Sequence, residues 1–169
     1  MTSAELLADA FDRIRQIVHR VLDGLEPGQL AFRVEPEANS IAWLVWHLTR
    51  IQDDHLADAF RAEQVWTAQG WVERFGLPFD PADTGYGHGP DEVAAVQVAG
   101  ELLAGYHDAV HQQTTRQLAP IGDTDLDRIV DRSWDPPVSL GVRLVSVVAD
   151  DLQHAGQAAF VRGVLLQRR

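Results

Sequence analysis

The chain has 169 residues, of which 46% are hydrophobic, and this length suits a single domain with one buried core. Its formal net charge of −11 disfavours nucleic acid and anionic membrane surfaces as partners, because both require a basic patch. It contains no cysteine, which excludes disulfides, thiolate metal sites and a cysteine nucleophile, and its 14 basic residues are all arginine, which excludes Schiff-base catalysis by lysine.

The first predicted helix begins at a capping box formed by Thr2 and Glu5 and ends near Gly24. Residues 25–39 contain two prolines and a glycine and are predicted to form a connection. The N-terminus is amphipathic and shows no signal-peptide pattern, and the longest apolar runs are too short to cross a bilayer. We therefore expect a cytoplasmic protein.

Two further helices are predicted in the middle of the chain. Asn39 or Ser40 is expected to cap the second helix. Residues 61–89 are rich in Gly, Pro and Trp and are predicted to form a long irregular loop, a type of segment that often acts as the lid or wall of a site. The third helix is expected to begin at Pro90 and to continue to about Leu118.

A fourth helix is predicted from a cap at Ser139 to about Leu166. In the loop before it, residues 129–134 are the only run that could be extended, and an isolated run does not predict a sheet. Four helices with long connections predict an all-α four-helix bundle and not an open α/β sheet. The bundle is expected to form one domain over residues 1–169.

Three polar side chains are predicted to lie in the apolar stripes of these helices: His47 in the second, and Asp150 with His154 in the fourth. A spacing of four residues places Asp150 and His154 side by side on one helical face. Burying a carboxylate and two imidazoles is costly, and a divalent metal ion is the simplest partner that would hold them. Such a set suits Zn²⁺, which we expect first, or Ni²⁺, Fe²⁺ or Mn²⁺, with a position left open for water or substrate.

Other readings of these residues stay open. The two histidines could instead be core residues that nearby carboxylates satisfy. Asp151 could replace Asp150 as the acidic ligand, although it points about 100° round the helix from Asp150. His107 and His111 form a second pair at four-residue spacing, but their polar neighbours predict that both face water.

The glycines carry weaker signals. Gly85, Gly87 and Gly89 fit neither a P-loop nor a dinucleotide fingerprint, so we expect a tightly turned loop instead. Gly156 lies inside the fourth helix, where it costs about 1 kcal/mol in helix propensity. The close approach of another helix is its expected explanation.

Three segments together resemble the DinB-like superfamily of four-helix metal proteins. They are NSIAWLVWHLTRIQDDHL, WVERFGLPFDPADTGYGHGPDEV and DDLQHAGQAAFVRG. The resemblance is greatest to an actinobacterial branch that includes mycothiol-dependent maleylpyruvate isomerase and mycothiol S-transferases. It implies that His47, Asp150 and His154 bind the metal and that mycothiol is the co-substrate. Many members carry His in place of Asp150, which leaves the identity of the metal open.

We therefore expect a metal-dependent enzyme that activates a small thiol, by resemblance mycothiol, for transfer to an electrophilic small molecule. The expected substrate contacts are His88, Trp71, Gln157 and Arg162. Three alternatives remain: a metal hydrolase, iron-dependent oxygen chemistry and a non-catalytic metal-binding stress protein. A homodimer formed through an exposed helix face or the Trp-rich loop is also compatible with the sequence.

Overall fold

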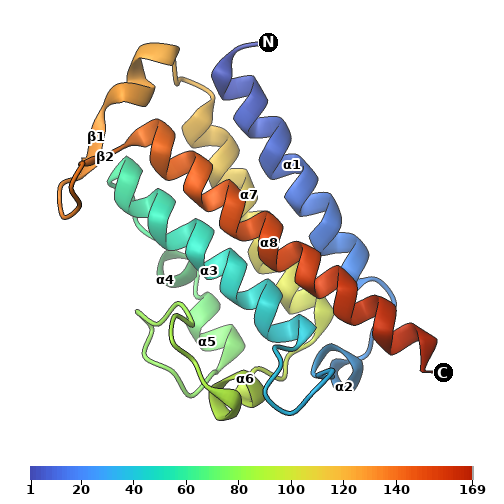
Figure 1. Cartoon of the computed structure of the whole chain (residues 1–169). Helices are drawn as coiled ribbons and strands as arrows, with labels where there is room; N and C mark the ends of the chain where they lie inside the picture. The colour runs from blue at the N-terminus through green and yellow to red at the C-terminus, as the bar shows by residue number, and fades with distance from the viewer. Residues whose placement is uncertain (169) are drawn as a thin grey trace.

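Four long helices pack side by side in the computed structural model, which describes residues 1–168 (Figure 1). They are α1 (Ser3–Leu22), α3 (Ile41–Phe60), α7 (Gly100–Leu118) and α8 (Leu140–Gln167). The shorter elements are α2 (Pro27–Leu30), α4 (Val65–Ala68), α5 (Trp71–Phe75), α6 (Pro90–Ala95), the 3₁₀ helix η1 (Asp123–Asp127) and the strands β1 (Ile129–Asp131) and β2 (Val138–Ser139). The predicted all-α bundle is confirmed, and no described helix is long and apolar enough to cross a membrane.

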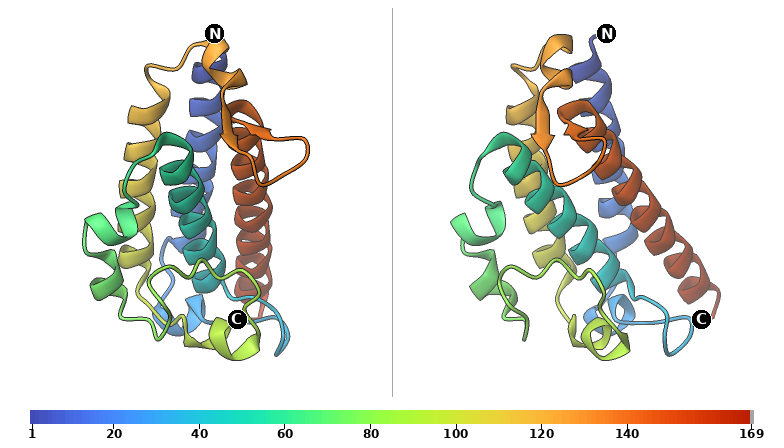
Figure 2. Two further views of the ribbon diagram at one scale, coloured as in Figure 1. Left: turned by 90° about the vertical axis from the view of Figure 1, so that its left-hand side faces the viewer. Right: turned by 60° about the vertical axis from the view of Figure 1, so that its left-hand side comes forward.

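The long helices run in two directions. In Figure 1, α1 and α8 descend from upper left to lower right, whereas α3 and α7 run the opposite way. Both α3 and α1 pack against α7 and α8, so the four helices enclose one core. Because α3 and α7 point the same way, the chain has to travel back along the bundle between them. Residues 61–99 make this crossing on the outside of the bundle (Figure 2).

The starts of the helices follow the capping signals in the sequence. Thr2 and Glu5 form the expected capping box of α1. The hydroxyl of Ser40 caps α3, so the cap is Ser40 and not Asn39, and the hydroxyl of Ser139 caps α8 in the same way. Each cap satisfies a backbone N–H that would otherwise lack a partner at the helix start.

The predicted third helix is split in two. Helix α6 ends at Ala95, and residues 96–99 leave the helical conformation before α7 begins at Gly100. Val96 and Val98 are buried on either side of an exposed residue, which is the alternation of an extended segment. Burial of two β-branched side chains at a spacing of two therefore outweighs the helical period here.

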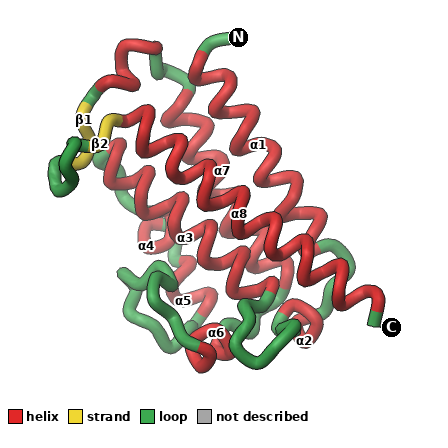
Figure 3. Tube along the Cα trace, viewed as in Figure 1, coloured by secondary structure: helices red, strands yellow, loops and turns green. Residues whose placement is uncertain are grey.

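Two further expectations about secondary structure are wrong. Residues 61–89 include the short helices α4 and α5, so the segment is less irregular than predicted. Residues 129–134 contribute strand β1, which pairs antiparallel with β2 at one end of the bundle (Figure 3). Arg143 of α8 binds the carboxylate of Asp131 at 2.7 Å and ties this hairpin to the bundle. Strands of two and three residues are too short to leave a periodic signal in the sequence.

His107 is buried, contrary to expectation. Only 1% of its surface is exposed, and the hydroxyl of Thr49 lies 3.1 Å from its Nδ1. Helix α7 packs against α1 on one side and α3 on the other. These neighbours cover the side of α7 that carries His107, which the sequence predicted to face water. His111 lies nearer the surface, with its Nε2 2.7 Å from a carboxylate oxygen of Asp12.

The burial of His107 predicts a pH dependence of stability. Burial lowers the pKa of this imidazole from 6.5 to about 3, so below pH 6.5 the unfolded chain binds a proton that the folded chain does not. The associated stability is present above pH 6.5 and is lost as the pH falls from 6.5 towards 3. Between pH 7.5 and pH 5, we expect the metal-free protein to lose about 2 kcal/mol more unfolding free energy than its His107→Asn variant. Urea unfolding at both pH values measures this difference, and equal losses would contradict it.

Candidate metal centre

His47, Asp150 and His154 meet where α3 packs against α8. Each offers one ligand atom, and these three atoms lie within 4.8 Å of one another. The ring centroids of the two imidazoles are 4.8 Å apart, and His47 is only 6% exposed. The spacing of four residues on α8 brings Oδ1 of Asp150 to 3.6 Å from Nε2 of His154. The tertiary structure thus brings together the three residues that the sequence singled out.

Both imidazoles are oriented through their Nδ1 atoms. Nδ1 of His47 donates to the carbonyl oxygen of Thr84 at 2.6 Å, and Nδ1 of His154 donates to Oε1 of Gln157 at 2.9 Å. Because both partners are oxygen acceptors, the neutral rings carry their proton on Nδ1, which leaves the lone pair of Nε2 for another ligand. Histidines that bind metals usually have such a partner on the second nitrogen.

The carboxylate of Asp150 also suits a cation. Its Oδ2 is buried and has no hydrogen-bond partner among residues 1–168. An unpaired buried carboxylate oxygen is costly, and a bound cation would remove that cost. Two imidazole nitrogens and one carboxylate oxygen are donors that Zn²⁺, Ni²⁺ and Fe²⁺ accept. The residues present therefore fit a divalent ion.

The electrostatics of the site agree with this fit. Burial lowers the pKa of His47, so this imidazole is neutral near pH 7 and its lone pair is available. Burial by itself would raise the pKa of Asp150, but the adjacent His154 and His47 rings hold that pKa below its ordinary value. The carboxylate in turn raises the pKa of His154. An anionic carboxylate oxygen thus lies beside two imidazole nitrogens that can bind a metal ion.

Asp151, the alternative acid, lies in the core of the bundle. It is 0% exposed, and neither of its carboxylate oxygens has a hydrogen-bond partner within the described chain. Burial and the charge of Asp150 raise the pKa of Asp151 well above its ordinary value, which favours the protonated acid. Among the described residues, the group whose ligand atoms converge contains Asp150 and not Asp151.

The end of the crossing segment covers the ring of His47. Gly85 has a φ of +91°, and a Cβ at this position would lie 2.9 Å from Nδ1 of His47 and 2.9 Å from the ring of Trp46. Only glycine allows the backbone to come this close in this conformation. Arg50 of α3 is fully buried and holds the loop by donating to the carbonyl oxygen of Asp83 at 3.1 Å. The glycine-rich spacing predicted a turned loop, but not which side chain the turn would touch.

His88 lies on the same loop and supports the site indirectly. Its Nδ1 accepts a hydrogen bond from the indole N–H of Trp43 at 3.1 Å, and its Nε2 donates to Asp83 at 2.9 Å. Trp43 stacks on the ring of His47, with centroids 4.6 Å apart and an interplanar angle of 14°. Both ring nitrogens of His88 are thus engaged in holding the wall around His47.

The other three expected substrate contacts lie in different places. Gln157 is at the site through its hydrogen bond to the imidazole on α8. Trp71 is 5% exposed and packs with the aromatic rings around Tyr106. Arg162 donates to the carbonyl oxygen of Val21 at the end of α1, at 3.1 Å. In the structure Trp71 thus contacts α7 and Arg162 contacts the end of α1, and their contacts with a substrate stay predictions.

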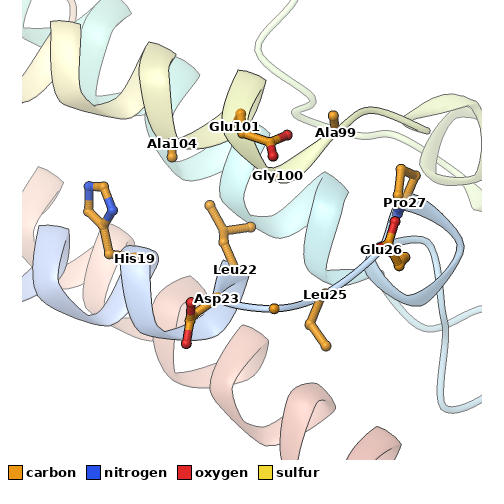
Figure 4. Close-up of a pocket in the computed structure, with 11 residues that line it drawn as sticks. His19, Leu22, Asp23, Leu25, Glu26, Pro27, Ala99, Gly100, Glu101 and Ala104 are labelled. Carbon is orange, nitrogen blue, oxygen red and sulfur yellow. The ribbon is translucent and has the colours of Figure 1, made fainter.

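A separate hollow of about 340 Å³ lies between the end of α1 and the start of α7 (Figure 4). Its lining includes His19 and the carboxylates of Asp23, Glu26 and Glu101. None of the residues that line it belongs to the cluster around His47. An acidic lining also disfavours an anionic ligand.

Comparison with known proteins gives the family. A family profile described as Mycothiol-S-transferase matches residues 6–167. The chain belongs to the mycothiol S-transferase family. A solved structure described as the conserved protein of locus from Enterococcus faecalis is 29% identical in sequence to the chain. The match covers 99% of each of the two chains and has a TM-score of 0.91. No curated protein matches the chain. The expected family and fold are thereby confirmed.

Gly85→Ala is expected to damage the candidate metal centre. The added methyl group would collide with His47 and Trp46, and a positive φ adds strain of about 1 kcal/mol or more. We expect the hydrogen bond from Nδ1 of His47 to the carbonyl oxygen of Thr84 to be lost and the affinity for Co²⁺ or Zn²⁺ to fall by roughly 10-fold or more. Competition with a chelating dye measures the metal affinity.

Gly87→Ala is the matched control. Its φ is +81°, but a Cβ there would meet nothing within 4 Å, so this variant has the backbone strain without the collision. Equal metal affinities of the two alanine variants would show that the contact between the loop and the imidazole is unimportant for the site.

Gln157→Ala should weaken metal binding without unfolding the helix. It removes the acceptor that orients the ring of His154, and such partners typically contribute about 10- to 100-fold in metal affinity. Alanine favours a helix, so thermal stability without metal should not fall. Gln153→Ala, on an exposed position of the same helix, is the control and should bind metal like the wild type. The role in orientation is excluded if both variants bind metal equally well.

Proposed function

We propose that this protein binds a divalent metal ion through Nε2 of His47, Nε2 of His154 and the carboxylate of Asp150, and transfers mycothiol to a small electrophile. Zn²⁺ is the proposed metal, with Ni²⁺ or Fe²⁺ as alternatives. One observation carries the proposal: two imidazoles with their Nδ1 atoms held by carbonyl oxygens converge with a carboxylate oxygen that has no partner in the described chain. The family supports mycothiol as the thiol.

A divalent ion in this position would supply a charge that lowers the pKa of a nearby thiol, so that the thiolate exists near neutral pH. The thiol has to come from outside, because the chain has no cysteine. The thiolate sulfur then forms a bond to an electrophilic carbon, whose leaving group departs with its electron pair. The proton released from the thiol passes to solvent.

The residues of the chain orient the donors and shield one side of the site. Thr84 and Gln157 fix which nitrogen of each imidazole is free. Trp43 and the backbone at Gly85 cover the ring of His47 and exclude water from that side. A drier site strengthens the attraction between a cation and a thiolate, because the local dielectric constant is lower.

The hydrolase alternative lacks comparable support. It requires a carboxylate near the metal that can act as a base. Asp151 is sealed in the core, and Asp54 already accepts a hydrogen bond from Gln64 at 2.8 Å.

A thiol titration of the Co²⁺-substituted protein tests the proposed function. We expect mycothiol to shift the visible spectrum of the bound Co²⁺, and we expect the Zn²⁺ protein to transfer mycothiol to iodoacetamide, measured as loss of free thiol. His47→Ala should lose metal, spectral shift and turnover together, because it removes one of three ligands. His111→Ala, a histidine on α7 outside the cluster, should retain all three.

The possible results separate the alternatives. No spectral change with any thiol would refute the transferase, and ester or amide hydrolysis without thiol would support the hydrolase. Full metal content in His47→Ala would refute the site itself.

A further inference from the structure

One face of α8 is both apolar and exposed. It consists of eight exposed, uncharged residues that follow one another at alternating steps of three and four, although 23% of the chain's residues are charged. These residues, which we call the α8 seam, are Val142, Val145, Ala149, Leu152, Gly156, Ala159, Gly163 and Leu166. Val142 and Val145 are 58% and 61% exposed. Apolar residues at this spacing are typical of a helix that packs along another helix in a coiled coil.

The two glycines of the α8 seam have no explanation within a single chain. Each lies inside a helix, where glycine is about 1 kcal/mol less favourable than alanine. The sequence predicted that another helix approaches Gly156 closely, and this is wrong within one chain. A Cβ at Gly156 or at Gly163 would meet nothing within 4 Å. Both glycines therefore leave open hollows on the exposed face of the helix.

The α8 seam is complementary to itself when a second copy lies antiparallel. We place a two-fold axis across the α8 seam, level with residue 154. Each seam residue of one copy then faces the residue of the second copy whose number is as far from 154 in the opposite direction. The facing pairs are Leu152 with Gly156, Ala149 with Ala159, Val145 with Gly163, and Val142 with Leu166. In each copy the hollows at Gly156 and Gly163 then receive the Leu and Val side chains that face them, as knobs enter holes in a coiled coil. A parallel pairing would place glycine opposite glycine and leave voids.

We propose that this protein forms a two-fold symmetric dimer through antiparallel packing of the α8 seams of two copies. The α8 seam is about 36 Å long, which is enough for a continuous helix-to-helix interface. Because it contains no charged residue, the contact buries no like-charge pairs in spite of the net charge of −11. A second copy of the chain carries the matching pattern of large residues and glycines, as a two-fold interface requires.

The proposed dimer interface shares one residue with a groove at the side of α8. His154 is level with the two-fold axis along α8, but it lies on the opposite side of the helix from the α8 seam and faces His47 of α3. A groove of about 470 Å³ opens beside the α8 seam. Gly156 belongs to both the groove and the α8 seam, and the groove is otherwise lined by Ala38, Asn39, Leu44, Gln157, Phe160 and Val161. The second copy would therefore lie against the edge of this groove, next to the residue that orients His154.

Sedimentation equilibrium of the whole chain tests the dimer without reference to metal or activity. We expect the wild type to dimerise and Gly156→Leu to weaken the dimer, because leucine fills the hollow that receives Leu152 of the partner subunit. Overpacking of this kind should raise the dimer Kd by roughly 10-fold or more. The variant should still fold, because its new side chain points into open space. Circular dichroism checks the fold, and Gly28→Leu, another open glycine outside α8, should not change the Kd.

A double variant tests the direction of packing. Leu152→Ala together with Gly156→Leu exchanges the large and the small side chain of one facing pair, so it should restore the dimer that Gly156→Leu alone weakens. A stronger dimer in Gly156→Leu would indicate parallel packing and refute the antiparallel arrangement. A monomeric wild type, or an unchanged Kd in Gly156→Leu, would refute the proposal while leaving the proposed function intact.

Discussion

The contact between the backbone of the crossing segment and the ring of His47 is the constraint on which the candidate site depends. The carbonyl oxygen of Thr84 can reach Nδ1 only because Gly85 has no side chain and adopts a positive φ. That single hydrogen bond fixes which nitrogen of the imidazole is free. It also brings the loop, with Asp83 and His88, against the tryptophan that stacks on the ring. The long connection thus forms one wall of the site.

Two neighbouring acids on α8 show how strongly position on a helix determines chemistry. Asp150 is half-buried beside two imidazoles, which hold its pKa low and keep it anionic. Asp151 is displaced by about 100° around the helix, enters the core and is favoured in its neutral form. One face of α8 therefore carries the candidate metal ligands, and another packs into the bundle. A third, the α8 seam, remains uncovered by the chain itself.

Two errors of the sequence-based predictions share one cause. Helical periodicity describes one helix at a time, and it cannot say which second helix covers a given flank. His107 looked solvated because its neighbours in sequence are polar, yet α1 and α3 cover it. The break before Gly100 arose in the same way, from the burial of two valines.

The sequence by itself determined the starts of α1 and α8, the absence of cysteine chemistry and the position of Asp150 and His154 on one face of a helix. These features follow from local chemistry and from the period of 3.6 residues, which places residues four apart on one face. Only the tertiary structure decided that Thr84 and Gln157 orient the imidazoles, that Asp150 and not Asp151 faces them, and that Gly85 must be a glycine. Those features depend on contacts between segments far apart in the chain, and no local pattern encodes such contacts.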